Sequence, residues 1–196
     1  MNLLHHPWNI VFLAGLVVYI FIRGRFIERT KRNEKALSRV DPTDRALMGV
    51  VGAGTLLLPV FYLLTPLLKF ADLPLPIYMP ASGSVIMLLA LWLFWRSHSD
   101  LGLNWSVTLE TRTGHELITN GVYRRIRHPM YSAIWLFSLA QALLLENWLA
   151  GPAALLCFAP LYFRRIPREE RMMIESFGDA YQHYMKKTGS IIPRLG

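Results

Sequence analysis

The sequence predicts an all-α integral membrane protein with five transmembrane helices. Hydrophobic residues make up 53% of the 196 residues, whereas only 17% are charged. The mean hydropathy of +0.31 also sets the chain apart from an average soluble domain. The charged residues leave five windows without Lys, Arg, Asp or Glu, which are Met1–Ile22, Ala46–Leu68, Leu73–Trp95, His128–Leu145 and Asn147–Phe163.

The lengths of these windows fit a bilayer. Roughly 20 apolar residues, rising 1.5 Å each, cross a hydrocarbon core of roughly 30 Å. The second and third windows have 23 residues each, and the fourth and fifth have 18 and 17. The first window lacks the basic start and the small-residue cleavage site of a signal peptide, so we interpret it as a retained helix.

The basic residues predict the orientation in the membrane. Of 21 Lys and Arg residues, all but Lys69 lie in Arg23–Arg45, Arg96–Arg127 and Arg164–Arg194. With five spans these segments share one side, which the positive-inside rule assigns to the cytoplasm. We therefore expect a multi-pass membrane protein with its N-terminus outside and its C-terminus in the cytoplasm. The net charge of +8 then indicates topology and contact with membrane lipids, not nucleic acid.

Local signals mark the second span. Asp41-Pro42-Thr43-Asp44 is typical of a helix start, with Asp41 or Thr43 as the N-cap. Pro59 and Pro66 are expected to interrupt or end this helix. Its glycines lack a preceding strand, so they predict close helix packing and not a nucleotide-binding loop. These glycines are Gly49, Gly52 and Gly54.

The last two spans are predicted to form a tight hairpin. They meet at Glu146-Asn147-Trp148, a turn so short that the spans must be antiparallel neighbours. This geometry places His128, at the start of the fourth span, close to Phe163–Arg165, at the end of the fifth.

Two polar segments flank this hairpin and are expected to face each other. They are His115–Tyr131, HELITNGVYRRIRHPMY, and Arg164–Glu170, RRIPREE. Beyond them, Arg168–Lys187 predicts a cytoplasmic C-terminal helix with Pro167 in its first turn. Because proline disrupts a helix interior, we also expect a break at this point.

The residue types in these segments suit a charged ligand. Arg127-His128-Pro129 opens the fourth span, where free backbone N–H groups favour a carboxylate. The rings of Tyr123 and Tyr131 can surround a cationic group. Arg165 adds a partner for a substrate anion, and Glu169 adds one for an ammonium group. The six histidines form neither HExxH nor a close ligand set, so no metal site is expected.

The joint pattern of HELITNGVYRRIRHPMY, the hairpin, RREE and FGDAYQHYMKKTGSIIP resembles the isoprenylcysteine carboxyl methyltransferase family. The likeness covers about residues 101–193, in a chain of the size of the short prokaryotic members. It implies one membrane methyltransferase domain, residues 1–196, with the catalytic part at about 101–193. It also implies S-adenosyl-L-methionine as methyl donor, held in a cytoplasm-facing pocket between the hairpin and the C-terminal segment.

The resemblance also implies site residues. Arg165 falls where the family places an arginine oriented to the substrate, and Glu169 resembles the glutamate that holds the amino-acid part of the cofactor. The resemblance leaves open whether Glu169 or Glu170 is the glutamate that holds the cofactor. For an amine acceptor, Glu170 or Tyr123 is the candidate base. The expected cofactor contacts are His115, Glu116, Leu117, Ile118, Tyr123, His128, Pro129, Met130, Tyr131 and Glu169.

The predicted function is therefore methyl transfer from S-adenosyl-L-methionine to a lipophilic acceptor reached from the bilayer. The carboxylate of an isoprenylcysteine is favoured, while amine and thiol acceptors remain open. Two other functions remain as alternatives, an NADPH-dependent membrane reductase of the sterol type and a non-catalytic lipid-binding membrane protein. The sequence indicates no oligomeric state.

Overall fold

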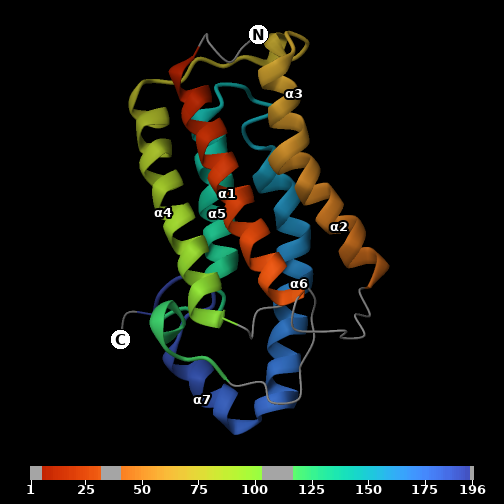
Figure 1. Ribbon diagram of the computed structural model, residues 1–196, viewed down its shortest axis with the longest axis vertical. Helices are drawn as coiled ribbons and strands as arrows, with labels where there is room; N and C mark the ends of the chain where they lie inside the picture. The colour runs from red at the N-terminus through yellow and green to blue at the C-terminus, as the bar shows by residue number, and fades with distance from the viewer. Residues whose placement is uncertain (1–5, 32–40, 103–116, 195–196) are drawn as a thin grey trace.

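The computed structural model describes residues 6–31, 41–102 and 117–194 (Figure 1). Within these ranges the chain is helical, without β-strands and with only two isolated β-bridges. This confirms the all-α class for the described residues. The α-helices are α1 (Pro7–Lys31), α2 (Pro42–Gly52), α3 (Leu58–Leu64), α4 (Tyr78–Leu101), α5 (Pro129–Leu144), α6 (Ala153–Phe177) and α7 (Asp179–Lys187).

The long helices lie side by side in a bundle (Figure 1). Helix α4 packs along α5, α1 packs against both, and α2 packs against α6. Three helical segments are long and apolar enough to cross a membrane, namely Pro7–Glu28, Pro42–Leu64 and Tyr78–Leu101. Helix α5 is also apolar but has only 16 residues. Short α7 lies at the lower end of the bundle in this view, below α6.

Helices α2 and α3 form one continuous rod through a π-helical segment, η2 (Ala53–Leu57). The wide turn lets Leu58 N–H bond to Ala53 O, just before Pro59, which has no N–H to donate. The expected interruption at Pro59 is therefore a local widening. The rod ends at Leu64, before the extended residue Thr65 that precedes Pro66.

The expected close packing of glycines is confirmed at one of the three positions. A Cβ on Gly54 would lie 2.6 Å from Cys157 Sγ and 2.8 Å from Ala153 O, both in α6. A Cβ on Gly49 or Gly52 would meet nothing within 4 Å. Gly54 thus sets how closely the α2–α3 rod approaches α6.

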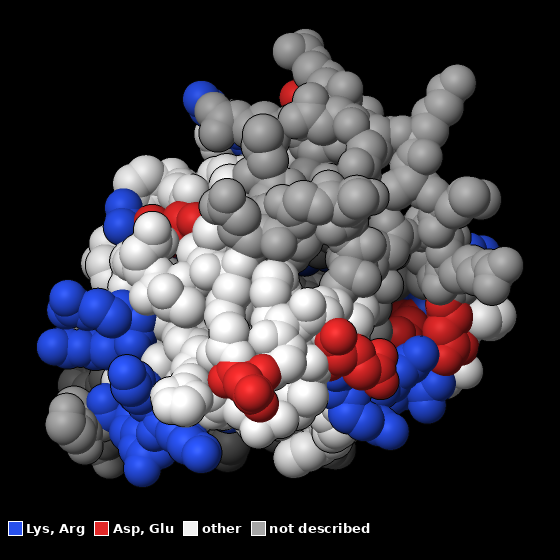
Figure 2. All heavy atoms as spheres, turned by 90° about the horizontal axis from the view of Figure 1, so that it is seen from below, with Lys and Arg blue, Asp and Glu red and all other residues white. Residues whose placement is uncertain are grey.

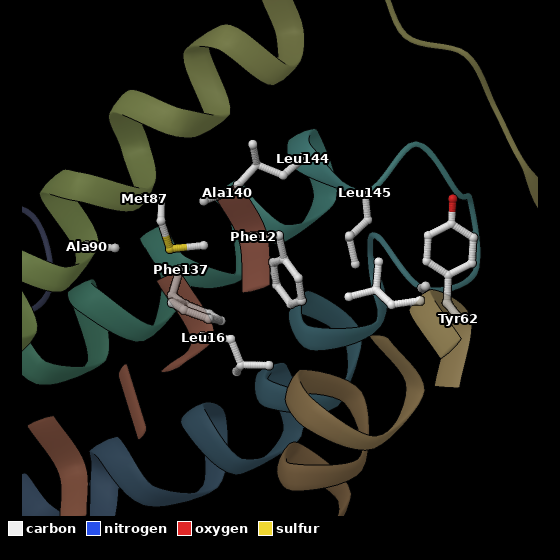
Figure 3. Packing of buried hydrophobic residues seen from close by; sticks show 11 residues of the cluster. Phe12, Leu16, Tyr62, Met87, Ala90, Phe137, Ala140, Leu144 and Leu145 are labelled. Atoms are coloured by element: carbon white, nitrogen blue, oxygen red, sulfur yellow. The ribbon is translucent and has the colours of Figure 1, made fainter. Parts of the chain in front are cut away.

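A hydrophobic cluster joins α1, α3, α4 and α5 (Figure 3). Phe12, Met87 and Phe137 are at most 2% exposed, and Ala90 and Ala140 provide small surfaces between α4 and α5. Without water to exclude inside a bilayer, such close van der Waals contact is what associates helices.

Helices α5 and α6 are antiparallel neighbours, as expected, but their connection is longer than the predicted three-residue turn. It runs from Leu145 to Pro152. The side chain of Asn147 holds this segment in place through hydrogen bonds. Its Oδ1 accepts from Leu149 N and Ala150 N at 3.1 and 2.9 Å. Its Nδ2 donates to Leu68 O at 2.8 Å.

The longer connection changes which residues face each other. Helix α5 has 16 residues, so the same length counted from Ala153 reaches Arg168 and Glu169 in α6. The polar contacts of His128 are therefore with Glu169 and Glu170, about one helical turn beyond the predicted Phe163–Arg165.

The predicted break at Pro167 is also wrong. Helix α6 continues through Pro160 and Pro167 and ends at Gly178, whose φ of 52° suits glycine. The predicted helix Arg168–Lys187 is therefore divided between the end of α6 and α7. Ion pairs with Asp41, the N-cap of α2, lie on both sides of Pro167.

We predict that Gly54→Ala lowers the thermal stability of the purified protein, whereas Gly52→Ala does not. The added methyl group clashes with Cys157 and Ala153 only at position 54. An overpacked contact of this kind costs about 1–3 kcal/mol, or a few °C in Tm, which a melting curve in detergent measures. Equal Tm values for the two variants would contradict this account of the α2–α6 contact.

Candidate active site

Polar side chains and backbone groups from distant parts of the sequence meet at the charged end of the bundle. They come from the start of α5, from the second half of α6 and from the tail Thr188–Arg194. Figure 2 shows this end from below, with groups of basic and acidic side chains around its rim. This arrangement confirms that the two polar segments flanking the hairpin face each other.

His128, the residue before α5, lies between two carboxylates of α6. Its Nε2 is 3.3 Å from Glu170 Oε1, and its Nδ1 is 3.6 Å from Glu169 Oε2. Burial by itself lowers the pKa of His128, but hydrogen bonds and charges from Glu169 and Glu170 raise it, and the net shift is upward. The imidazolium form is thus favoured by its two acidic neighbours.

Each glutamate has a second partner in α5 or just before it. The Tyr131 hydroxyl donates a short hydrogen bond to Glu169 Oε1. Arg127 donates to Glu170 Oε1 from Nε and Nη2 at 3.1 and 2.9 Å. The hydrogen bond from His128 lowers the pKa of Glu170, burial opposes this shift, and Arg127 adds to it. Glu170 is therefore held ionised.

Arg127 also fastens the C-terminal tail. Its Nη1 donates to Thr188 O at 2.6 Å and to Met185 O at 3.2 Å. The backbone N–H groups of Arg127 and His128 donate to Gly189 O and Ser190 O, both at 2.9 Å. The tail therefore uses two N–H groups before α5 that the sequence suggested as a carboxylate site. From the sequence we interpreted Arg127 only as part of a helix start. Its hydrogen bonds to Glu170 and to the C-terminal tail were not predicted.

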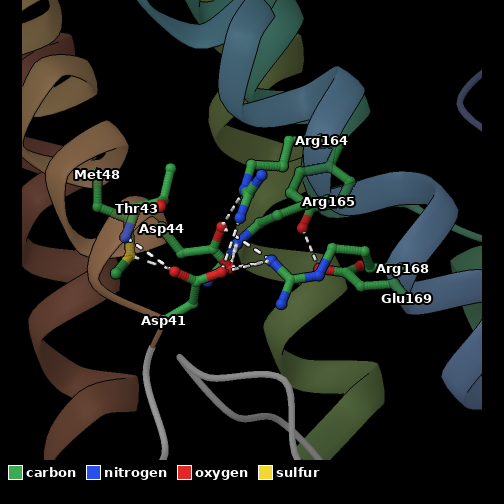
Figure 4. A network of polar contacts seen from close by, with 9 residues as sticks. Asp41, Thr43, Asp44, Met48, Arg164, Arg165, Arg168 and Glu169 are labelled. Carbon is green, nitrogen blue, oxygen red and sulfur yellow. Dashed lines mark hydrogen bonds and ion pairs between the residues drawn. The ribbon is translucent and has the colours of Figure 1, made fainter.

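Arg165 lies one helical turn before Glu169 on α6, and its side chain reaches towards α2. Its Nε is 3.8 Å from Asp44 Oδ2, and its Nη2 is 4.0 Å from Met48 Sδ (Figure 4). It also interacts with the Tyr131 side chain. Arg165 thus lies between the acidic start of α2 and the glutamate cluster.

Two further arginines of α6 pair with the start of α2. Arg164 donates to Asp41 and Asp44 at 2.7 and 3.0 Å, and Arg168 reaches both at 3.2 and 3.3 Å. Asp41 also caps α2, as expected, by accepting from Thr43 N at 2.9 Å. That backbone hydrogen bond, followed by the one from Arg164, lowers the pKa of Asp41 to about 2. No sequence signal linked these aspartates to α6, since more than 110 residues separate them.

The other expected site residues have different surroundings. Tyr123, in the 3-10 helix η5 (Gly121–Arg124), donates to Ser97 O at 3.2 Å, so its hydroxyl is directed to α4. Pro129 is buried at the start of α5, and Met130 packs towards Leu93 and Phe94 of α4. Leu117 and Ile118 are half-buried before η5, and His115 and Glu116 lie outside the described residues.

We predict that stability depends on pH through this cluster. The raised pKa of His128 gives stability that is present at low pH and lost as pH rises through that pKa. The lowered pKa of Glu170 gives stability that is present above its ordinary pKa and lost as pH falls through the lowered one.

The Tm should therefore be highest between these two limits. His128→Gln should remove the alkaline loss, which we expect to be a few °C, at about 2–4 °C per kcal/mol for a chain of this size. His183→Gln, at an exposed position of α7, is the control and should keep it. Parallel Tm profiles for wild type and His128→Gln would refute this account.

Comparison with known proteins finds relatives of the region that contains the candidate site. Residues 83–175, just under half of the chain, match the model of the isoprenylcysteine carboxyl methyltransferase (ICMT) family. A protein-S-isoprenylcysteine O-methyltransferase of Schizosaccharomyces pombe is 35% identical over 81 residues, which are 41% of this chain and 34% of that protein. A probable one of Oryza sativa subsp. indica is 33% identical over 111 residues, 57% of this chain and 56% of that protein.

The chain thus spans about a third to just over a half of these curated relatives. The fold itself is similar to that of a solved eukaryotic intramembrane Ras methyltransferase ICMT, with a TM-score of 0.62 and 23% identity. That similarity covers 98% of this chain and 70% of the other. The segment that matches the family model, residues 83–175, holds η5, α5 and most of α4 and α6.

Proposed function

We propose that this protein transfers a methyl group from S-adenosyl-L-methionine to the carboxylate of a lipophilic acceptor in the membrane, of the isoprenylcysteine type. One observation carries the proposal. The buried cluster of His128, Tyr131, Glu169 and Glu170 lies within the segment that matches the methyltransferase family. It also lies where the apolar helices meet the charged end of the bundle, so it adjoins both the bilayer and water.

The residues present fit this methyl donor. S-adenosyl-L-methionine carries a sulfonium and an ammonium group, which suit carboxylates and aromatic rings. Glu169 and Glu170 are about four-fifths buried, and the ring of Tyr131 stacks towards that of His128 at 5.8 Å between centroids. We infer that Glu169 holds the ammonium group, while Glu170, bound by Arg127, shapes the same wall.

The bound donor supplies an electrophilic methyl group, so the protein has to orient the reactants and exclude water. A carboxylate acceptor is already a nucleophile and needs no general base. Arg165 would hold it through paired guanidinium hydrogen bonds. An amine acceptor would first have to lose a proton, for which Glu170 is the candidate base.

The proposed topology has five spans. They are α1, the α2–α3 rod, α4, α5 and the apolar first part of α6. The N-terminus then lies outside, the charged end with the site lies in the cytoplasm, and basic residues at its rim contact anionic lipid headgroups. One domain, residues 1–196, carries this site, with its catalytic part at about 101–193.

Titration of the purified protein with S-adenosyl-L-methionine and with NADPH tests the proposal against the alternatives. We expect saturable binding of S-adenosyl-L-methionine and transfer of its labelled methyl group to S-farnesylcysteine. Binding of NADPH without S-adenosyl-L-methionine would instead support a membrane reductase. Binding of neither would support a lipid-binding protein.

A variant tests the site itself. Glu169→Gln should weaken S-adenosyl-L-methionine binding at least tenfold, about 1.4 kcal/mol, because the ammonium group loses its carboxylate. Glu175→Gln, exposed on the same helix, is the matched control and should bind as wild type does. Unchanged affinity of Glu169→Gln would refute the role given to this glutamate and leave Glu170 as the holder.

A further inference from the structure

The two aspartates at the start of α2 form an ion cluster with three arginines of α6 (Figure 4). Its members are Asp41, Asp44, Arg164, Arg165 and Arg168. Asp44 is 3% exposed and contacts all three arginines. Three cations against two anions leave this cluster with one surplus positive charge. A surplus charge that is partly removed from water favours the arrival of an anion.

Within this cluster Arg165 differs from the other two arginines. The side chains of Arg164 and Arg168 are 38% and 36% exposed, whereas that of Arg165 is 11% exposed. Arg164 and Arg168 contact both aspartates, but the ion pair of Arg165 in this cluster is with Asp44. Arg165 is therefore the inner arginine, and Asp44 is its acidic neighbour from α2.

Arg165 also adjoins the candidate cofactor site. It interacts with Tyr131, whose hydroxyl donates to Glu169. A guanidinium group has five N–H donors in one plane, so it can serve one carboxylate through Nε and a second one along another edge. The Asp44 pair is made through Nε.

We propose that Asp44 is a positioning residue for Arg165 and thereby sets the affinity for the carboxylate of the methyl acceptor. This inference rests on the proposed function. The carboxylate of Asp44 draws the guanidinium towards α2. Without it, the guanidinium would be able to pair with Glu169, which also contacts Tyr131, and there it would compete with the ammonium group of the cofactor. Helix α2, outside the segment that matches the family, thus takes part in acceptor binding.

Asp44→Asn and Asp41→Asn make a matched pair of variants. Each removes one carboxylate from the same cluster and keeps the shape of the side chain, and asparagine retains the N-cap at position 41. Of these two aspartates, Asp44 forms an ion pair with Arg165, while Asp41 contacts Arg164 and Arg168.

Methyl transfer by the full chain is measured with S-farnesylcysteine as acceptor. We expect Asp44→Asn to raise the KM for this acceptor about tenfold, with kcat and the Kd of S-adenosyl-L-methionine within about twofold of wild type. Asp41→Asn should leave all three unchanged. A general loss of structure would lower kcat or cofactor affinity in both variants. Equal acceptor KM values for the two variants would overturn the inference.

A double-mutant cycle tests whether Asp44 acts through Arg165. In an Arg165→Ala background, Asp44→Asn should change the acceptor KM no further, because the residue that it positions is gone. Additive effects would overturn the inference. If Asp44→Asn does not fold, Asp44→Glu keeps the charge but displaces it, and an acceptor KM equal to that of wild type would again overturn the inference.

The failure of the proposed function has a different signature. A wild-type protein that binds no S-adenosyl-L-methionine would overturn both proposals together. An active wild type in which Asp44→Asn and Asp41→Asn behave alike would overturn only the role of Asp44.

Discussion

The charged end of this bundle depends on how the carboxylates of Glu169 and Glu170 are neutralised. Both lie on α6 beside a largely apolar bundle, where an unpaired charge is costly. Their partners come from the start of α5, with His128 between them and Arg127 and Tyr131 on either side. Arg127 carries the same interaction to the tail, through Thr188 O. The hairpin, the tail and the candidate site are therefore joined through the contacts of the same few side chains.

The features that could be predicted from the sequence are those that depend on repeated patterns of residues or on neighbouring residues. Charge-free windows located the long helices, and Asp41 was recognisable as an N-cap because capping needs only neighbouring residues. The antiparallel hairpin followed from a short connection. The polar segments at its ends were found for the same reason, and five of the expected site residues do lie together, namely His128, Tyr131, Arg165, Glu169 and Glu170.

Features that depend on distant partners were beyond such reasoning. Asn147 lengthens the connection by bonding to its own loop and to Leu68, which the composition of the turn does not reveal. Helix α6 continues through Pro167, and the arginines on both sides of it pair with Asp41, a partner far away in sequence. The pairing of α2 with α6 joins residues far apart in sequence, and neither periodicity nor local motifs encode it.

The contact between Gly54 and Cys157 is a second attachment between the α2–α3 rod and α6. Asp44 lies ten residues before Gly54 in the same rod, or about 15 Å along a helix. The rod is therefore held to α6 at two heights, by close packing in the apolar interior and by ions at its charged end. Because the rod is attached at both points, the spacing at Gly54 helps to set where the start of α2 presents Asp41 and Asp44 to α6. If Asp44 positions Arg165 as proposed, helix packing inside the bundle thereby contributes to acceptor binding at its charged end.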